Sequence, residues 1–373
     1  MKRKTFFPNY NHSILGITNT LLRHYGVHSN VYYLPELDDV IKHDYKNIVF
    51  IILDGMGVDM MQNDLPFFSF LRRHIKSKIS SVFPPTTVAA TTSYYSGYSP
   101  VEHGWLGWSP YFKKFGKVIE IFKNKDYYTG EKIKEDVMKD IPYVHIFDRI
   151  KQVNKDVCLT QIMPQKIRPD GISNFDELCE RVIRQTKEPG KQFVLGYWLD
   201  PDSTSHEYGP YSKNVKDVLK QLNSKIKKMC SGLDDTLVII SADHGHIESE
   251  DVMLNDYPEL MDCLALPLSL DGRAQAVFLK KDKEEVFIKL FDKYLAKDFV
   301  LVKSQKALDS NLFGQGKEHP AVKDFLGDYL IIATGEKSLV QRFENDKYNY
   351  LPGMHSGITN KEMVVPLILV EKK

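Results

Sequence analysis

Short apolar runs alternate with amphipathic segments along the first two-thirds of the chain. The runs that we interpret as strands are 47–53, 77–83, 144–147, 157–163, 192–199 and 236–242. Apolar residues recur at helical spacing between them, in 58–75, 87–95, 174–187 and 211–231. Strands that alternate with helices, and that are continuously apolar, are typical of parallel sheets covered on both faces. The pattern therefore predicts an α/β fold with a mostly parallel central sheet and helices on both faces.

The pattern changes after residue 248. Strand-like runs at 274–280, 299–304 and 328–334 enclose one helical segment near 284–295. We interpret 255–335 as a smaller α+β lobe inserted into a single catalytic domain that spans 1–373. The apolar run 363–370 is predicted to return to the central sheet as its last strand.

Composition narrows the class of protein. The chain has 373 residues, a formal net charge of +1 and 27% charged residues, which is typical of a globular protein that binds neither a nucleic-acid polymer nor a membrane surface. No run approaches the roughly 18–20 apolar residues of a membrane span, and the N-terminus has no signal-peptide pattern. We therefore expect a cytoplasmic location; the oligomeric state is not visible. The four cysteines are too widely spaced to predict a disulfide framework or a Cys-based zinc site: Cys158, Cys179, Cys230 and Cys263.

Polar side chains follow three of the predicted strands at the point where each strand ends. Asp54 follows the first, Asp200 and Asp202 follow another, and Asp243 and His244 follow a third. A single Asp after a strand is usually the N-cap of the next helix. Because ligand sites in open α/β sheets lie beyond the carboxyl ends of the strands, we expect these residues to meet at one edge.

Two more histidines, His206 and His355, lie in turn-like sequences. Carboxylates and neutral imidazoles without thiolates are ligands that suit zinc or manganese. Asp202 and His206 are four residues apart, so that both can reach one ion from a single helical turn. Two ions about 3.5–4 Å apart would suit phosphoryl transfer. His246 is left over, and we interpret it as an outer-shell or surface residue rather than a ligand.

A hydroxyl-rich segment begins after Pro84-Pro85. Thr86 and Thr87 precede a run of small residues at a predicted helix N-terminus. A hydroxyl at this position is commonly an N-cap. It can also be a nucleophile, since the positive end of the helix dipole favours an alkoxide and a phosphate. The segment alone leaves both interpretations open.

Five blocks in order carry a family resemblance: "FIILDGMG", "FPPTTVAATTSYYSGYSPVEHG", "DPDSTSHEYGP", "ISADHGH" and "GMHSG". Together they resemble the metal-binding blocks of the alkaline phosphatase superfamily, and in particular the type I phosphodiesterase/nucleotide pyrophosphatase branch. The blocks extend from residue 50 to residue 357, so the resemblance covers most of the chain.

The resemblance implies two divalent metal ions, with zinc as the expected metal and manganese as the alternative. One ion would be bound by Asp54, Asp243 and His244, and the other by Asp202, His206 and His355. Thr87 would lie between the ions as a metal ligand and as the covalent nucleophile. A phosphoester hydrolase acting through a phosphothreonine on a small phosphorylated substrate, most simply a phosphodiesterase or nucleotide pyrophosphatase, is the activity that this implies.

The sequence departs from the family pattern beside the nucleophile. Thr86 stands where the family often has Lys, and Ala90 where it usually has Asn. A phosphonoacetate-type C–P hydrolase or a phosphomonoesterase of the same superfamily therefore stays open, as does a non-catalytic metal-binding protein on this fold. Thr91 could supply a hydroxyl in compensation.

An aromatic group follows the nucleophile segment: Trp105, Trp108, Tyr111, Tyr127 and Tyr128. These rings could stack on a planar part of the substrate. Packing in the core or against the lobe is the more common use of such side chains.

Overall fold

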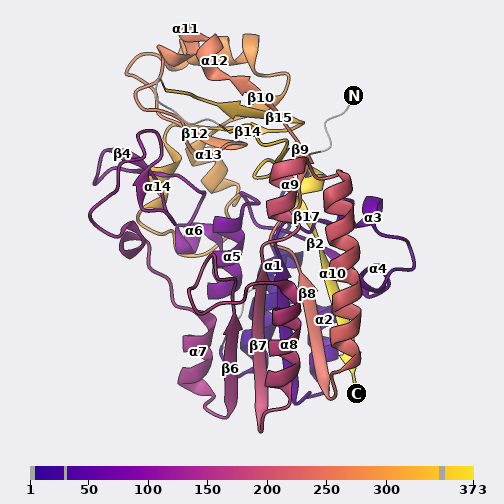
Figure 1. Ribbon diagram of the computed structural model, residues 1–373. Helices are drawn as coiled ribbons and strands as arrows, with labels where there is room; N and C mark the ends of the chain where they lie inside the picture. Colours follow the sequence, from indigo (N-terminus) through magenta and orange to yellow (C-terminus); the bar gives the residue numbers. More distant parts are fainter. Residues whose placement is uncertain (1–4, 29–31, 344–348) are drawn as a thin grey trace.

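The computed structural model describes residues 5–28, 32–343 and 349–373. Its centre is a six-stranded sheet (Figure 1). In spatial order the strands are β2 (Ile75–Ser80), β17 (Val364–Lys372), β8 (Thr236–Ser241), β1 (Asn47–Leu53), β7 (Lys191–Trp198) and β6 (Val157–Ile162). β1 pairs in parallel with β7 and β8, and β6 pairs in parallel with β7. β17 is antiparallel to both of its neighbours, so that the predicted mostly parallel sheet is confirmed.

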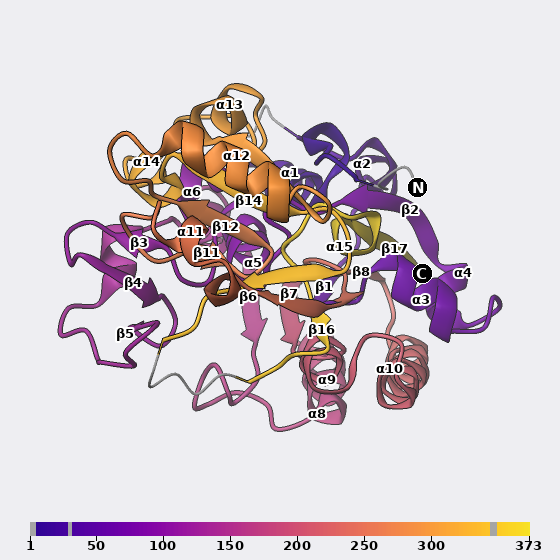
Figure 2. The same cartoon turned by 90° about the horizontal axis from the view of Figure 1, so that it is seen from above.

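Helices cover both faces of this sheet (Figure 2). One face carries α1 (Ile14–His24), α2 (Pro35–Ile41), α5 (Thr87–Ser96) and α7 (Ile146–Val153), and the other carries α3 (Val58–Asp64), α8 (Phe175–Thr186) and α10 (Lys213–Ser231). Every residue of β1 is buried, as expected for a central parallel strand packed on both sides. The predicted α/β class, with helices on both faces, is therefore correct.

Two element predictions were wrong. The segment 58–75 was predicted as one helix, but α3 ends at Asp64, α4 is short (Phe70–Arg73) and β2 already begins at Ile75. Pro66 explains the break, because proline lacks an N–H and disfavours the α conformation at the residue before it. Leu65 is accordingly extended, at φ −102° and ψ 140°.

The run 144–147 was predicted as a strand, but it contains the start of helix α7. His145 caps this helix, since its ring nitrogen accepts a hydrogen bond from the backbone N–H of Phe147 at 3.1 Å. The apolar residues Ile146, Phe147 and Ile150 then fall on one buried helical face.

A second, antiparallel sheet lies above the carboxyl edge of the central sheet (Figure 1). Its strands in order are β11 (Ser269–Asp271), β12 (Ala274–Val277), β14 (Tyr329–Ala333) and β13 (Phe299–Lys303). Helix α12 (Glu284–Tyr294) packs on it through Phe287 and Phe291. Ala274, Leu330 and Val88 of α5 belong to one hydrophobic cluster, so the lobe and the hydroxyl-rich segment share a core. The limits 255 and 335 of this lobe stay predictions.

Short paired strands connect the lobe to the sheet. β9 (Ile247–Glu248) pairs with β16 (Gly353–Met354), and β10 (Glu250–Met253) pairs with β15 (Lys337–Val340). These pairs place the segment that follows His246 beside the segment that precedes His355. A three-stranded sheet lies apart from them: β3 (Tyr111–Phe112), β4 (Lys117–Glu120) and β5 (Lys125–Asp126). The remaining helices are short: α6 (Pro100–His103), α9 (Asp202–Tyr208), α11 (Pro258–Met261), α13 (Ser304–Asp309), α14 (Val322–Leu326) and α15 (Asn360–Met363), with 3₁₀ turns at Tyr10–His12, Val137–Asp140 and Leu254–Asp256.

Candidate metal centre

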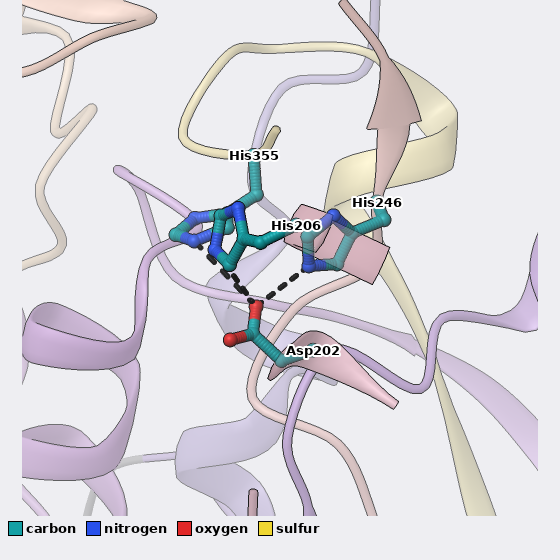
Figure 3. A group of neighbouring side chains, drawn as sticks. All are labelled: Asp202, His206, His246 and His355. Carbon is teal, nitrogen blue, oxygen red and sulfur yellow. Dashed lines mark hydrogen bonds and ion pairs between the residues drawn. The ribbon is translucent and has the colours of Figure 1, made fainter. Parts of the chain in front are cut away.

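One carboxylate and three imidazoles gather at the carboxyl edge of the sheet (Figure 3). Asp202 and His206 lie on α9, one turn apart, while His246 follows β8 and His355 follows β16. One ligand atom from each of the four residues lies within 4.8 Å of the others. The sequence prediction included all of them except His246.

The distances separate His246 from the other two histidines. Nε2 of His206 lies 3.3 Å from Oδ1 of Asp202, and Nε2 of His355 lies 3.8 Å from the same oxygen. Ligand atoms that bind zinc tetrahedrally at about 2.0–2.1 Å are separated by about 3.3 Å. Those two distances fit a shared ion. Nε2 of His246 is 2.6 Å from Asp202, which is a hydrogen-bond distance.

A second group consists of Asp54, Asp243 and His244. Nε2 of His244 lies 3.3 Å from Oδ1 of Asp54 and 3.6 Å from Oδ2 of Asp243. Among the residues that the structure describes, neither of these two buried oxygens has a hydrogen-bond partner. Buried polar atoms are nearly always paired, so that two unpaired oxygens facing one imidazole nitrogen fit a site for a cation.

The remaining oxygens of this second group are held by the protein. Oδ2 of Asp54 accepts a hydrogen bond from the hydroxyl of Tyr197. Oδ1 of Asp243 accepts from the backbone N–H groups of Gly55 and His244, both at 3.0 Å. These contacts fix the orientation of both carboxylates and leave one oxygen of each directed toward His244.

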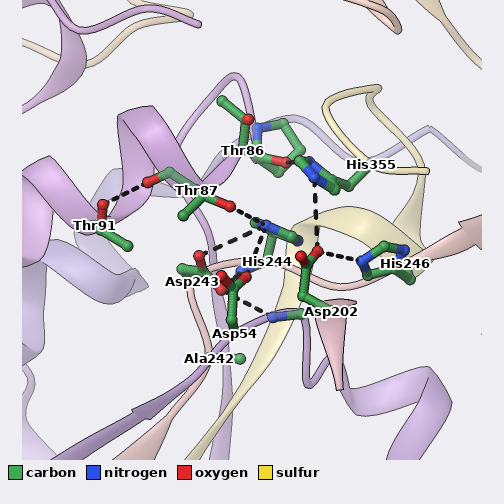
Figure 4. A network of polar contacts seen from close by, with 12 residues as sticks. Asp54, Thr86, Thr87, Thr91, Asp202, Ala242, Asp243, His244, His246 and His355 are labelled. Carbon is green, nitrogen blue, oxygen red and sulfur yellow. Dashed lines mark hydrogen bonds and ion pairs between the residues drawn. The ribbon is translucent and has the colours of Figure 1, made fainter. Parts of the chain in front are cut away.

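Thr87 is the first residue of α5 and lies beside the second group (Figure 4). Its Oγ1 is 3.2 Å from Nε2 of His244. The first N–H groups of a helix have no intrahelical acceptor and attract anions. The predicted compensating hydroxyl of Thr91 is used elsewhere, because it donates to the carbonyl of Thr87 at 2.6 Å. A phosphate group at this point would therefore meet the start of α5 rather than the hydroxyl of Thr91.

The two groups influence one another electrostatically. Burial, together with the charges of Asp202 and Asp243, raises the pKa of Asp54 well above its usual value. Burial would also raise the pKa of Asp202, but the neighbouring His206 and His246 outweigh it and hold that pKa well below its usual value. Burial lowers the pKa of His355 far below its ordinary range, and the nearby His244 adds to this effect. Three carboxylates thus lie close together, with Asp54 and Asp243 buried and Asp202 partly buried, an arrangement that bound cations would stabilise.

Asp200 was the alternative to Asp202 at the end of the same strand. Its Oδ1 accepts hydrogen bonds from the backbone N–H of Thr204 at 3.3 Å and from the hydroxyl of Thr204 at 2.7 Å. Asp200 therefore supports the start of α9, whereas Asp202 faces the histidines. A cavity of about 260 Å³ flanks this segment, lined by Pro164, Gln165, Lys166, Ile172, Ser173, Trp198, Leu199, Asp200 and Ser203.

Glycine at position 245 allows the "DHGH" turn to pack closely against Gly57 and Lys361. A Cβ atom on Gly245 would lie 2.0 Å from the carbonyl oxygen of Lys361 and 3.1 Å from Cα of Gly57. The N–H of Gly245 donates to the carbonyl of Glu362 at 2.8 Å. Only a residue without a side chain allows His244 and His246 to flank this contact.

The lobe contributes a residue that sequence reasoning missed. Oδ2 of Asp271, at the end of β11, accepts a hydrogen bond from Oγ1 of Thr86 at 2.9 Å. Burial raises the pKa of Asp271, against the effect of its hydrogen bonds. Asp271 follows an apolar run at a strand end, but the sequence does not indicate its partner, because the contact joins segments that are 185 positions apart.

The aromatic side chains that follow the nucleophile segment have different surroundings. Trp105 is 4% exposed, and its indole N–H donates to the carbonyl of Ile141 at 2.7 Å. Trp108 donates to Glu120 at 3.0 Å. Tyr111 and Tyr128 line a cavity of about 220 Å³ between the β3–β5 sheet and the lobe. Trp105 thus has the packing role; substrate stacking by the others stays a prediction.

Carboxylate and imidazole groups without thiolates, beside a hydroxyl at a helix N-terminus, are characteristic of metal-dependent hydrolases. The fold and the site put the chain in this class.

The family follows from comparison with known sequences. A sequence model of the type I phosphodiesterase / nucleotide pyrophosphatase family matches residues 48–357. The chain belongs to this family, and the predicted family membership is confirmed.

Individual relatives match over shorter stretches. The chain is 25% identical to bis(5'-adenosyl)-triphosphatase ENPP4 of Bos taurus over 225 residues, which is 56% of this chain and 49% of that protein. It is 30% identical to the Homo sapiens ENPP4 over 126 residues, which is 31% of this chain and 28% of that protein. The chain thus spans about half the length of the bovine relative and less of the human one.

Solved structures share the fold. Murine ENPP5, as an inactive variant with a threonine replaced by alanine, in complex with AMP, superposes with a TM-score of 0.63 at 16% identity, over 86% of this chain and 87% of that one. Phosphonoacetate hydrolase from Sinorhizobium meliloti 1021, in complex with phosphonoacetate, has a TM-score of 0.61 at 14% identity, over 86% and 89%. At these identities the likeness extends to the fold alone.

Within the described part of the chain, no helix combines the length and the apolar character needed to cross a membrane. The cytoplasmic location stays a prediction from the sequence.

Proposed function

We propose that this hydrolase cleaves small phosphodiesters or nucleotide pyrophosphates through a phosphothreonine intermediate on Thr87. The observation that carries the proposal is the position of Oγ1 of Thr87. It lies at the N-terminus of α5 and 3.2 Å from His244, beside two groups of potential metal ligands. The adenosine-based substrate in the name of the ENPP4 relatives and the AMP bound to murine ENPP5 support a nucleotide substrate.

We assign Asp54, Asp243, His244 and Thr87 to one divalent ion and Asp202, His206 and His355 to the other. Zinc is the ion that we propose, since the donors are carboxylates and imidazoles. When bound, the ions would supply Lewis-acid activation of the threonine hydroxyl and neutralise charge that develops on the phosphoryl group and the leaving oxygen.

The residues of the chain perform the remaining steps. The hydroxyl of Thr87 loses its proton to solvent and Oγ1 forms a bond to phosphorus, while the bond between phosphorus and the leaving oxygen breaks and the leaving oxygen takes a proton from solvent. A water molecule then attacks the same phosphorus and loses a proton to solvent, the bond to Oγ1 breaks, and Oγ1 takes a proton from solvent. The N–H groups at the start of α5 would bind an equatorial phosphoryl oxygen throughout.

The test is hydrolysis by the zinc-loaded Thr87→Ala and Thr87→Ser variants. Loss of the nucleophile is expected to lower kcat by about three orders of magnitude or more. Atomic emission should show that most of the zinc is retained, because Asp54, Asp243 and His244 still bind that ion. The serine variant keeps a hydroxyl and should keep part of the activity. Acid quenching of the wild-type chain, followed by peptide mass spectrometry, should detect phosphate on Thr87. Full metal-dependent activity of the alanine variant would exclude Thr87 as the nucleophile.

A C–P hydrolase is the second candidate, because phosphonoacetate hydrolase shares the fold to almost the same degree as ENPP5. There the bond between phosphorus and carbon would break, and the carbon would take the proton. Rates with bis-p-nitrophenyl phosphate, p-nitrophenyl phosphate and phosphonoacetate, each with added zinc or manganese, separate diesterase, monoesterase and C–P hydrolase activities.

A further inference from the structure

Asp271 reaches the metal centre from the lobe. It ends β11 at a tight turn into β12, where it is paired in register with Ala274. Its Oδ2 accepts the hydrogen bond from Thr86, and its Oδ1 accepts from the N–H of Gly272 at 3.0 Å. Asp271 therefore contacts the residue that immediately precedes Thr87, although none of the predicted metal ligands lies in the lobe.

The hairpin that carries Asp271 also holds the residue that follows His355. Burial raises the pKa of Asp271, and Ser356 and the backbone N–H of Trp108 lie near enough to oppose this effect. The hydroxyl of Ser356 accepts a hydrogen bond from the backbone N–H of Arg273 at 3.2 Å. The hairpin 271–273 thus joins the neighbour of the proposed nucleophile to the neighbour of a proposed metal ligand.

A direct hydrogen bond also connects those two segments. Nδ1 of His355 lies 3.1 Å from the carbonyl oxygen of Pro85, at donor–acceptor distance, while its Nε2 faces Asp202 (Figure 4). Backbone partners of this kind fix the orientation of a metal-binding imidazole. The hairpin adds a second link between the segments, because Asp271 binds Thr86 and the N–H of Arg273 binds Ser356.

The backbone beside Asp271 and beside His355 is strained. Ser356 has φ +88° and Leu270 has φ +79°, in the left-handed region that residues other than glycine rarely adopt. Leu270 is held by two backbone hydrogen bonds with Ser109, at 2.7 and 2.9 Å. Strained conformations persist where the surrounding contacts over-determine them, and they concentrate at functional sites.

A buried ion pair anchors the hairpin that carries Asp271. Nε of Arg273 donates to Glu362 at 2.7 Å, Nη2 donates to the other carboxylate oxygen at 3.1 Å, and both side chains are fully buried. Glu362 also accepts from the N–H of Gly357 at 2.7 Å. The hairpin is therefore fixed to the loop that contains His355 through two independent sets of contacts.

We propose that Asp271 is a positioning residue, supplied by the lobe, that holds Thr86 against the hairpin bound to Ser356 and thereby fixes Thr87 relative to His355. Both of its carboxylate oxygens accept hydrogen bonds from the protein, so that it acts on the site through these neighbours rather than on the substrate. The inference about activity rests on the proposed function, whereas the inference about metal binding does not.

The experiment compares the full-length wild-type chain with Asp271→Ala and Asp271→Asn. Zinc affinity is measured by calorimetry after chelator treatment, and kcat and KM are measured with bis-p-nitrophenyl phosphate. Because outer partners of metal ligands typically contribute 10–100-fold to metal affinity or activity, we expect zinc affinity and kcat of the alanine variant each to fall by about tenfold or more. KM should change little, and the asparagine variant, which keeps one acceptor oxygen, should recover part of both losses.

A double variant tests whether Asp271 acts through Thr86. Thr86→Val removes the hydroxyl at nearly constant volume, so the variant with both Asp271→Ala and Thr86→Val should have nearly the same zinc affinity and kcat as Asp271→Ala alone.

The matched control is Asp126→Asn. Asp126 is 7% exposed and accepts from the backbone N–H groups of Tyr128 and Thr129, but it lies in the β3–β5 sheet. This control should keep wild-type zinc affinity and kcat.

Wild-type zinc affinity and kcat in Asp271→Ala would overturn the proposal, and so would fully additive effects of the two substitutions. A wild-type chain that binds zinc but hydrolyses no phosphoester would refute the proposed function alone, and the calorimetric comparison would still decide the role of Asp271. If the alanine variant does not fold, Asp271→Asn and Thr86→Val carry the comparison, with thermal unfolding as the measure of their integrity.

Discussion

The imidazole rings of His244 and His355 are stacked, with centroids 3.8 Å apart and planes inclined by 22°. His244 belongs to the group with Asp54 and Asp243, and His355 to the group with Asp202 and His206. The stacking therefore brings the two groups into direct contact. Two imidazolium ions would repel each other in this position, whereas neutral rings that each bind a metal ion would not.

His246 should strengthen metal binding without being a ligand. His246→Ala removes the hydrogen bond of 2.6 Å to Asp202, and we expect zinc affinity to fall by about 10–100-fold. His246→Gln can still donate to Asp202 and should retain more of the affinity. Competition with a fluorescent zinc chelator measures both variants. Unchanged affinity in His246→Ala would contradict this role.

Zinc binding should release protons near neutral pH. Burial lowers the pKa of His206, but the charge of Asp202 outweighs it and raises that pKa to about 9, from a usual value of 6.5. The metal-free protein therefore carries a proton on His206 at pH 7, and this proton contributes stability that is lost as the pH rises through about 9. A zinc ion must displace the proton, so that affinity should rise about tenfold per pH unit between about pH 6 and 8.

Calorimetry in two buffers of different ionisation enthalpy counts the protons released on zinc binding. We expect about one per chain at pH 7, from His206. Binding without proton release, or an affinity independent of pH over this range, would show that His206 is neutral before zinc binds.

Gly245→Ala should displace the turn that carries His244 and His246. The added Cβ would lie 2.0 Å from the carbonyl of Lys361, and relief requires movement of the backbone. We expect the free energy of unfolding to fall by about 1–3 kcal/mol and zinc affinity to fall with it. Chemical denaturation and zinc titration provide the measurements. Gly335→Ala is the control, since nothing lies within 4 Å of its added Cβ.

Arg273→Met should destabilise the protein by about 3–5 kcal/mol, because it leaves the buried Glu362 without its cation. The three other donors to Glu362, from Gly357 and Thr359, favour the lower end of this range. Urea denaturation of the metal-free chain measures the change. Lys42→Met, which breaks an exposed pair with Asp39, should have no measurable effect. Equal stability of the two variants would contradict the importance of the buried pair.

Much of the fold could be predicted because buried parallel strands leave a strong local signal. β1 is a continuous apolar run, and its limits were predicted without error. The residues that the structure gathers at the carboxyl edge were found for the same reason, since Asp54, Asp202 and Asp243 follow strands whose ends must meet. The two wrong element predictions have local causes. His145 caps a helix in the segment predicted as a strand at 144–147, and Pro66 ends the helix predicted for 58–75.

The contribution of the lobe could not be predicted in this way. Asp271 and Arg273 form one short hairpin, and their partners Thr86 and Glu362 lie 185 positions before and 89 positions after them. The Asp271-Gly272 pair between apolar runs is a local signal for a hairpin turn, but nothing local indicates which segments that turn contacts. Only the folded chain shows that a polar turn of the lobe is packed against the nucleophile segment.

The place of β17 in the sheet has a consequence for synthesis on the ribosome. This strand lies between β2 and β8, although it follows the lobe in the sequence. Until residues 364–372 emerge from the exit tunnel, β2 has no partner strand in the sheet and the edge of β8 is open. A nascent chain that already contains all the proposed metal ligands would still expose two unpaired strand edges, which are binding sites for chaperones and starting points for aggregation.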